Sequence, residues 1–389
     1  MNTFETDAAF VAHTYARFPV EIVGGKGSVL TGSDGKSYID LGSGIAVNTL
    51  GVCDAGWIKA VTDQLHRVCH TSNLYYSAPC ANLAAELCAR TGMQKVFFSN
   101  SGAEANECAV KAARAYGAAK HGADCYTILT IKNSFHGRTL TTLAATGQDA
   151  FHEKFQPLTP GFVSIEPTPA ALAAALDTYR VAAVLFEIVR GEGGVLPLDK
   201  AFVDALVKEA AAHDFLLMCD EVQCGNGRSG TLYAYMQYGL SPDVVTTAKG
   251  LCGGLPLGAT LLGDKVADLF TPGSNGSTFG GNPIAAAGAL YVLSKLDDDL
   301  LAGVRRKSEL ICEALTGAPG VGSVTGLGLM LGVQTALPAK EVASRCIGRG
   351  VLVLTAKDKV RLLPALNIPD DLLMQALGIL KDICAEGVQ

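Results

Sequence analysis

Short apolar segments alternate with alanine-rich segments through the middle of the chain, and this alternation constrains the fold more than any other feature. The apolar segments predict strands and the alanine-rich segments predict helices. Strands joined by helices make right-handed crossovers, so the sequence predicts an α/β fold with a mostly parallel sheet, whose ligands bind beyond the carboxyl ends of the strands. We expect strands at 95–99, 126–131, 182–187, 215–220 and 244–247, and helices at 102–120, 169–178 and 200–214.

The two ends of the chain have a different pattern. Before residue 45, VLTGSDGKSYIDLGSG indicates a hairpin whose turn is Ser33-Asp34-Gly35. After residue 285 we expect a long helical stretch, a glycine-punctuated strand pair near 322–333, another helix, and a final helix from Asp370. The expected domains are therefore a large α/β domain at 46–285 and a smaller α+β domain built from 1–45 and 286–389.

Composition narrows the class of protein. Of the 389 residues only 17% are charged and 49% are apolar, so the chain can bury a large core and a subunit interface. A net charge of −6 without a block of like charges argues against nucleic-acid binding. No apolar run approaches the roughly 18 residues of a membrane helix, and no signal peptide is visible. The twelve cysteines include no C-x-x-C pair, so we expect a cytoplasmic protein with reduced thiols and no metal site.

The segment SNSGAEAN, residues 99 to 106, lies between a predicted strand and a strong predicted helix. Ser101 and Glu104 have the spacing of a capping box. This segment is either only a well-capped helix start or an anion site. In the second case Gly102 lets backbone N–H groups approach a phosphate, whose negative charge the helix dipole favours.

The segment CDEVQCGNGRSG follows the predicted strand at 215–220. Its Gly225-x-Gly227-x-x-Gly230 formally matches a dinucleotide-binding fingerprint, which would favour a nicotinamide oxidoreductase. That fingerprint should begin directly after the strand and open a helix, whereas DEVQ intervenes here. Asp220 is more informative, because a carboxylate at the tip of a buried strand is either a structural acid or the partner of a cationic ring.

Lys249 follows the predicted strand at 244–247 and precedes the glycine-rich loop GLCGGLPLGA. Desolvation there would lower its pKa and make it a nucleophile able to form a Schiff base. The alternative is an ordinary lysine that extends from the strand end toward water. A phosphate-binding helix start, a strand-tip Asp and a strand-end Lys are together what pyridoxal phosphate requires.

In this order, the motifs resemble those of class III (omega) aminotransferases, which are fold type I pyridoxal-phosphate enzymes. The resemblance covers nearly the whole chain and includes HTSNLYY, SFHGRT, RGEGG, GSTFGGNP and VRLLPALNI. It implies bound pyridoxal 5'-phosphate and a homodimer with shared active sites. The implied reaction, a step of arginine biosynthesis, transfers the distal amino group of N-acetylornithine to 2-oxoglutarate and yields a semialdehyde and glutamate.

The resemblance also implies cofactor-binding roles, with Lys249 and Asp220 as the catalytic residues. Lys249 would form the Schiff base, and Asp220 would pair with the pyridine nitrogen. The other implied cofactor contacts are the backbone amides of Gly102 and Ala103 and the side chain of Thr278 from the neighbouring subunit at the phosphate, Phe135 stacked on the ring, and Gln223 with its neighbours Glu221 and Val222 beside the ring.

For the substrates, the resemblance implies two arginines. Arg138 would bind the α-carboxylate of the amino donor, and Arg361 would bind the α-carboxylate of glutamate or 2-oxoglutarate, because a guanidinium suits carboxylates. Glu192 would neutralise Arg361 when the substrate lacks that carboxylate. Ser277 would lie close to the substrate, and Glu187, at a strand end, would support the site.

Three segments depart from the family pattern. The usual Glu-Pro-x-Gln-Gly-Glu reads EIVRGE at 187–192, which adds the cation Arg190 near the cofactor region. Leu-Gly-His with a following His-Pro becomes LGVCDA at 50–55, and Gly-Ser-His-Gly-Ser-Thr-Phe becomes GSNGSTF at 273–279. None of these changes touches the Lys, Asp or phosphate residues, so the expected reaction class is unaffected.

Other activities on the same scaffold stay open at this point, because a fold does not determine a reaction. They are an omega-aminotransferase acting on ornithine, succinylornithine or 4-aminobutyrate, and a pyridoxal-phosphate aminomutase or epimerase. Arg138, Glu192 and Arg361 together favour transamination, since they serve two carboxylate substrates in turn. An aminomutase would need no external amino acceptor.

Overall fold

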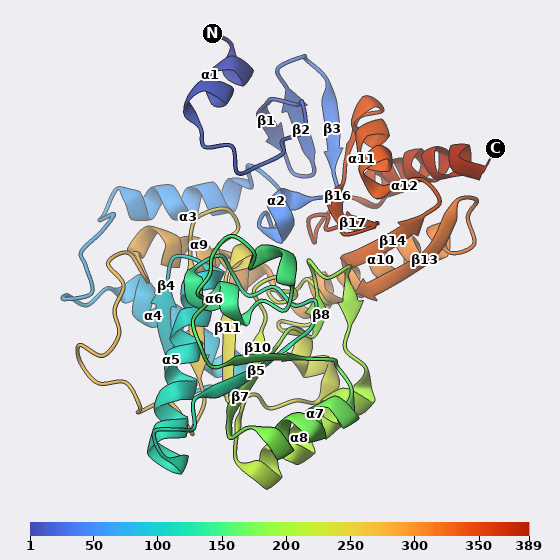
Figure 1. Ribbon diagram of the computed structural model, residues 1–389. Coiled ribbons are helices and arrows are strands. Elements are labelled where there is room, and N and C mark those ends of the chain that lie inside the picture. The colour runs from blue at the N-terminus through green and yellow to red at the C-terminus, as the bar shows by residue number, and fades with distance from the viewer. Residues whose placement is uncertain (389) are drawn as a thin grey trace.

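A seven-stranded sheet forms the centre of the structure, a computed structural model that describes residues 1–388 (Figure 1). Its strand order is β4-β12-β11-β10-β7-β5-β6. All neighbouring strands are parallel except β12, which is antiparallel to both β4 and β11. The mostly parallel sheet is therefore confirmed. The strands are β4 (Lys95–Ser99), β5 (Thr127–Ile131), β6 (Phe162–Ile165), β7 (Val181–Phe186), β10 (Leu216–Asp220), β11 (Val244–Thr247) and β12 (Gly258–Leu262).

The five predicted strands are all present, within one residue at either end, whereas β6 and β12 were not expected from the sequence. β6 is a four-residue edge strand, too short for a clear apolar pattern. β12 has the sequence GATLL and follows a glycine-rich loop, so the strand–helix alternation that predicted the other strands is absent before it. It is antiparallel because the connection from β11 is too short for a helical crossover.

Helices cover the sheet at the predicted places. α5 (Gly102–His121) packs against β7, β11 and β12. Its buried face is rich in alanine, which lets the helix lie close to the strands and form a second, smaller apolar core beside the main one. α7 (Pro169–Thr178) and α8 (Lys200–His213) pack against each other, and the short α6 (Leu140–Ala145) packs on α5.

Three helices form a group beside the β4 edge of the sheet. α3 (Ala55–Leu65) and α4 (Ala78–Thr91) both pack against α9 (Pro283–Lys295), and α4 also contacts β4. α9 spans the boundary expected at residue 285. The domain boundaries stay a prediction.

The two ends of the chain meet in one small sheet, as Figure 1 shows where blue strands lie beside a red segment. β2 and β3 form the expected hairpin around Asp34, whose Oδ1 accepts a hydrogen bond from the Lys36 amide at 3.1 Å. A C-terminal strand then pairs in parallel with β3. The elements of this part are α1 (Thr3–Phe10), β1 (Ile22–Lys26), β2 (Val29–Gly32), β3 (Ser37–Asp40), the short α2 (Ser43–Ala46) and β15 (Val351–Leu352).

A separate sheet, built from C-terminal strands alone, carries Arg361. Its order is β13-β14-β17-β16, and Arg361 on β17 lies opposite Gly332 on β14. The elements here are α10 (Asp298–Leu315), β13 (Val321–Leu327), β14 (Met330–Thr335), α11 (Ala339–Gly348), β16 (Leu354–Ala356), β17 (Lys359–Leu362) and α12 (Asp370–Ala385).

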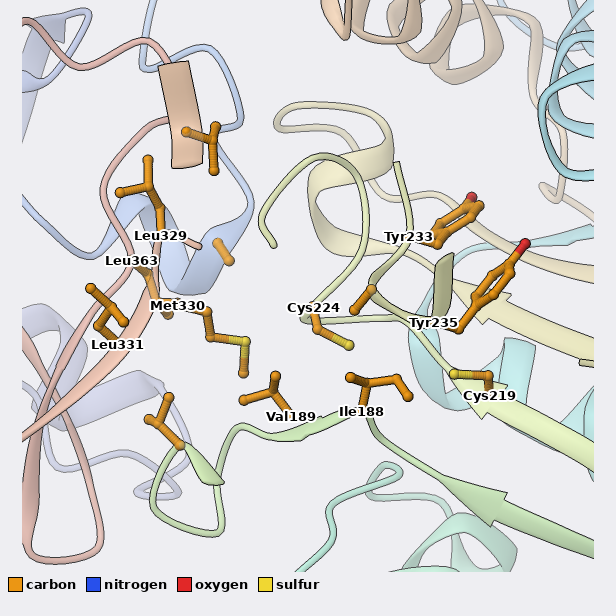
Figure 2. Close-up of a cluster of buried hydrophobic side chains, with 14 of the residues drawn as sticks. Ile188, Val189, Cys219, Cys224, Tyr233, Tyr235, Leu329, Met330, Leu331 and Leu363 are labelled. Atoms are coloured by element: carbon orange, nitrogen blue, oxygen red, sulfur yellow. The ribbon is translucent and has the colours of Figure 1, made fainter. Parts of the chain in front are cut away.

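One apolar cluster joins this C-terminal sheet to the central sheet, as Figure 2 shows. Buried side chains near the end of β10 meet others from β14 and from the segment after β17, so β17 is held at the carboxyl end of the central sheet. The labelled members are Ile188, Val189, Cys219, Cys224, Tyr233, Tyr235, Leu329, Met330, Leu331 and Leu363. Val189 belongs to the two-residue strand β8 (Val189–Arg190), which pairs with β9 (Leu196–Pro197).

No helix within residues 1–388 is both long and apolar enough to cross a bilayer.

Candidate active site

Lys249 and Asp220 lie at the carboxyl ends of adjacent parallel strands. Asp220 is the last residue of β10, and Lys249 comes two residues after β11, at the start of the 3₁₀ helix η3 (Lys249–Leu251). The carboxyl ends of parallel strands meet at one edge of a sheet, which brings two residues that are distant in sequence into one site.

Asp220 is surrounded by hydrogen-bond donors. Its Oδ2 accepts from Asn106 Nδ2 at 2.7 Å and contacts His136 Nδ1 at 2.8 Å, and its Oδ1 accepts from the Val222 amide at 3.0 Å. Asn106 is oriented in turn by Thr246, whose hydroxyl donates to Asn106 Oδ1 at 2.7 Å. A carboxylate only accepts hydrogen bonds, so these contacts hold the side chain of Asp220, which is only 3% exposed, in one orientation.

The sequence did not single out Asn106 or His136 as site residues. Each nevertheless lies within a motif that it did single out, SNSGAEAN and SFHGRT. The signal that could have found Asn106 is an asparagine on the apolar face of α5, between Ala105 and Ala109, because a buried amide needs polar partners.

Lys249 is held in an unusual backbone conformation. Its φ of 44° is in the left-handed region, which costs a non-glycine residue roughly 1–2 kcal/mol. Hydrogen bonds on both sides offset this cost. Asn226 Nδ2 donates to the Ala248 carbonyl at 3.1 Å, and the Thr49 hydroxyl donates to the Gly250 carbonyl at 2.7 Å.

The charge environment of Lys249 matches a reactive amine. Burial lowers the pKa of Lys249, and the carboxylates of Asp220, Glu192 and Glu187 partly oppose this shift, in that order. Among the described residues 1–388, no carboxylate lies within the 4.0 Å of an ion pair with Lys249. The amine therefore stays available to a ligand.

The start of α5 offers an anion site. Ser101 caps the helix, because its Oγ accepts from the Glu104 amide at 3.2 Å. Glu104 reaches back to the amide of Asn100 at 2.9 Å rather than to that of Ser101, so the expected capping box is displaced by one residue. Within the described part of the chain the amides of Gly102 and Ala103 donate to no protein group, and N–H groups at a helix start attract phosphate.

Gly102 is required by close packing. A Cβ atom at this position would lie 2.6 Å from Cγ1 of Val222, so no larger residue fits between the start of α5 and the segment after β10. This contact places Val222 beside the anion site.

Arg361, which is buried, forms an ion pair with Glu192, which is partly exposed. Arg361 Nη1 donates to Glu192 Oε1 at 2.5 Å and to Gln223 Oε1 at 3.0 Å, and Gln223 Nε2 donates to Glu192 at 3.3 Å. Burial alone would raise the pKa of Glu192, but the charge and hydrogen bond of Arg361 lower it below the usual value. The side chain of Arg361 is only 4% exposed, so the two charges stabilise each other in a poorly solvated place.

Arg138 has a different environment. It is exposed, and its Cζ lies 4.2 Å from the ring centroid of Phe151 and 5.6 Å from that of Phe135. No carboxylate of residues 1–388 pairs with it, so its guanidinium is free to receive an external anion.

Glu187 links the loop of Phe135 to the turn of Gly191. Its Oε2 accepts from the Phe135 amide at 2.9 Å, and its Oε1 accepts from the Gly191 amide at 3.3 Å. Burial raises the pKa of Glu187 to about 7, while the charge of His136 lowers it and that of Asp220 raises it. One side chain thus ties the loop of Phe135 to the turn that carries Glu192.

Glu221 contacts the protein rather than the Lys249 amine. Its carboxylate accepts from the Tyr235 amide at 2.7 Å and from the thiols of Cys224 at 3.3 Å and Cys219 at 3.7 Å. Burial raises the pKa of Glu221 to about 7. The side chain joins β10 to the 3₁₀ helix η2 (Ala234–Tyr238), and its contact with a cofactor stays a prediction.

Ser277 and Thr278 lie in the loop before α9. Ser277 Oγ accepts from Asn100 Nδ2 at 3.3 Å, so this serine lies near the start of α5. Thr278 is exposed, and its role at the phosphate of another subunit stays a prediction.

The departures from the family pattern have local explanations. Arg190 is buried, and its Nη1 donates to the Lys132 carbonyl at 3.2 Å rather than to a member of the Lys249 site. Asn275 Oδ1 accepts from Lys111 Nζ at 2.8 Å, and Asp54 caps α3 through the Trp57 amide at 2.8 Å.

No group of three or more His, Cys, Asp or Glu residues that could hold a metal ion occurs in the part of the chain that the structure describes.

The chain is similar to known proteins over nearly its whole length. A family model described as class-III aminotransferase matches residues 10–384. Acetylornithine aminotransferase of Haemophilus ducreyi is 46% identical over 385 residues, which cover 98% of each chain. The crystal structure of N-acetylornithine aminotransferase from Stenotrophomonas maltophilia is 35% identical, with a TM-score of 0.86 and 99% of each chain covered. Ornithine aminotransferase from Toxoplasma gondii, whose active site is partially occupied by pyridoxal phosphate, has a TM-score of 0.94 at 28% identity, covering 99% of this chain and 94% of that chain.

Proposed function

The chain belongs to the class-III aminotransferases, which use pyridoxal phosphate, and from this premise we propose that it transfers the distal amino group of N-acetylornithine to 2-oxoglutarate. The products are the semialdehyde of N-acetylglutamate and glutamate. The observation that carries the proposal is the Glu192–Arg361 ion pair, whose two charges both act on Lys249, together with Arg138, which pairs with no carboxylate of residues 1–388. Such a site can accept a substrate with one carboxylate and then a substrate with two.

The residues present suit pyridoxal phosphate. The free amides of Gly102 and Ala103 would hold the phosphate, and the unpaired Lys249 would hold the aldehyde carbon. When bound, the cofactor supplies a carbonyl that condenses with primary amines and a ring that withdraws electrons. Asp220 would hold a proton on the pyridine nitrogen, since its carboxylate is oriented by Asn106 and His136.

The two substrates place contradictory demands on one site. N-acetylornithine presents its distal amine and has one carboxylate, whereas 2-oxoglutarate presents its α-carbon and has two carboxylates. We infer that Arg138 binds the far carboxylate in both half-reactions. Glu192 neutralises Arg361 while the donor is bound and is displaced when the α-carboxylate of the keto acid arrives.

A donor panel tests the proposed substrate. We expect the purified holoenzyme, identified by its visible absorbance, to convert N-acetylornithine with a higher kcat/KM than ornithine, succinylornithine or 4-aminobutyrate. Each reaction is run with 2-oxoglutarate, and glutamate is measured as the product. A higher kcat/KM for any other donor would reject N-acetylornithine, and turnover without 2-oxoglutarate would favour an aminomutase.

The Glu192–Arg361 ion pair predicts that substituting Arg361 affects the two half-reactions unequally. Arg361→Ala should slow the 2-oxoglutarate half-reaction by about 10- to 100-fold, because one charge-assisted contact contributes roughly 1.5–3 kcal/mol. It should spare the N-acetylornithine half-reaction, because Arg361 would then keep its partners Glu192 and Gln223 and would not contact the substrate. Single-turnover kinetics measure each half separately.

Three further variants control this experiment. Arg138→Ala should slow both half-reactions, and Glu192→Ala should shift preference toward α-amino donors such as glutamate, because Arg361 is then unpaired. Arg306→Ala removes an exposed arginine that pairs with Asp370 and should change neither half. Equal losses in both halves for Arg361→Ala would remove the displacement of Glu192 from the mechanism.

A second copy of this chain is part of the proposal. Leu74, Tyr75, Tyr76 and Phe279 are exposed apolar side chains, and a groove of about 680 Å³ lies between α3, α4 and α9 nearby. Such a surface suits a homodimer whose subunits share the loop of Thr278. A cytoplasmic location completes the proposal.

A further inference from the structure

The two arginines of the site are held by different forces. Arg361 is buried and pairs with Glu192, so a carboxylate that binds it must displace an anion. Arg138 is exposed, and aromatic rings are its neighbours, with Phe151 at 4.2 Å and Phe135 at 5.6 Å from its Cζ. Arg138 therefore needs no exchange of partners before it binds a substrate.

Phe151 and Phe135 also support each other. Their ring centroids are 6.0 Å apart and their planes are at 75°, which is the edge-to-face arrangement that aromatic pairs prefer. The guanidinium of Arg138 lies over the face of Phe151 at the closer distance. Three side chains thus form one cluster in which Phe151 touches both partners.

The segment of Phe151 is anchored to the loop that carries Arg138. Phe151 ends the 3₁₀ helix η1 (Asp149–Phe151), and its amide donates to the Gln148 carbonyl at 3.1 Å. Gln148 Nε2 donates to the Ser134 carbonyl at 3.0 Å. The ring of His152 contacts two more backbone carbonyls through Nε2, both at 2.9 Å. The backbone that carries Phe151 is therefore held beside the loop of Arg138.

A guanidinium over an aromatic face is held by the ring quadrupole, and this contact uses none of its five N–H donors. Those donors remain available for two parallel hydrogen bonds to a carboxylate. We propose that Phe151 is a positioning residue that orients Arg138 for the carboxylate of each substrate. The proposal rests on the proposed function, in which Arg138 binds that carboxylate.

Binding of a non-reactive ligand tests this role without turnover. Glutarate, a dicarboxylate without an amino or keto group, is titrated into the holoenzyme by calorimetry. Phe151→Leu should weaken glutarate binding by about 2- to 5-fold, the range of a cation–π contact at an exposed site. Phe151→Tyr keeps the ring, and Phe155→Leu removes an exposed phenylalanine of the same loop, so both should bind glutarate as the wild type does. If Phe151→Leu does not load cofactor, Phe151→Met replaces it.

A double-mutant cycle separates positioning from a general structural effect. Phe151→Leu should weaken glutarate binding in the wild type and have no further effect in Arg138→Ala, because the contact it removes is then absent. Additive losses, unchanged binding in Phe151→Leu, or unchanged binding in Arg138→Ala would each overturn the proposal.

Kinetics supply a second readout. Phe151→Leu should raise KM for the carboxylate-bearing donor by a similar factor, leave kcat nearly unchanged, and spare n-pentylamine, which has no carboxylate. Equal losses for both amines would contradict a positioning role. If the wild type does not convert N-acetylornithine, the proposed function fails, whereas Phe151 is still judged by the glutarate cycle.

Discussion

Lys249→Ala is expected to lower turnover by several orders of magnitude. Lys249 is the amine at the edge of the sheet whose pKa burial lowers, with Asp220, Glu192 and Glu187 around it. It would hold the cofactor and also move a proton at the reacting carbon of the substrate, so one substitution removes two functions. Single-turnover kinetics with N-acetylornithine measure the loss.

Chemical labelling locates the attachment site. Borohydride reduction of the holoenzyme followed by peptide mapping should find the pyridoxyl group on Lys249. Lys307 is a suitable control, because burial lowers its pKa too, but its Nζ donates to the Leu366 carbonyl at 3.1 Å. Lys307→Met should keep the label on Lys249, and a label on any other lysine would reject the assignment.

Asp220→Asn is expected to lower kcat by about 10- to 1,000-fold. A nearby opposite charge shifts the pKa of an ionisable group by about 1–3, which is 10- to 1,000-fold in the equilibrium between its protonated and deprotonated forms, and the pyridine nitrogen would lose this stabilisation of its protonated form. Asparagine cannot stabilise a protonated pyridine nitrogen. Its NH₂ group would also face donors, since the neighbours of Asp220 are Asn106 Nδ2, His136 Nδ1 and the Val222 amide. The phosphate contacts at Gly102 and Ala103 are untouched, so cofactor binding should weaken much less than kcat.

Cofactor absorbance and kcat, measured on the same samples, check this expectation. Asp243→Asn is a matched control, because Asp243 accepts a hydrogen bond from the Leu217 amide at 2.9 Å and is a partly buried aspartate at the other end of the strands. It should lower thermal stability and leave kcat unchanged. A near-normal kcat with full cofactor occupancy in Asp220→Asn would contradict the role of Asp220.

The alternating middle of the chain determined the five strands and three helices that were predicted, and also the position of Asp220 and Lys249 at the strand ends. Such features depend on neighbours within a few residues, where apolar periodicity, capping residues and glycines act directly. The edge at which Asp220 and Lys249 meet follows from parallel pairing alone. The placement of Asp220 and Lys249 at one edge of the sheet was therefore accessible from the sequence, and their chemical roles stay predictions.

The tertiary structure decided which side chains orient these residues. Asn106 and Asp220 are 114 residues apart, and Glu192 and Arg361 are 169 apart. The ring of Phe151 meets Arg138 where the segment of η1 returns to the loop of Ser134, whose carbonyl accepts a hydrogen bond from Gln148. β12 enters the sheet antiparallel, and β15 joins the N-terminal strands, without any local signal for either pairing. A local pattern determines which residues are buried or form a strand. Contacts between distant segments depend instead on how helices and sheets pack, so this packing brings Asn106 to Asp220 and Arg361 to Glu192.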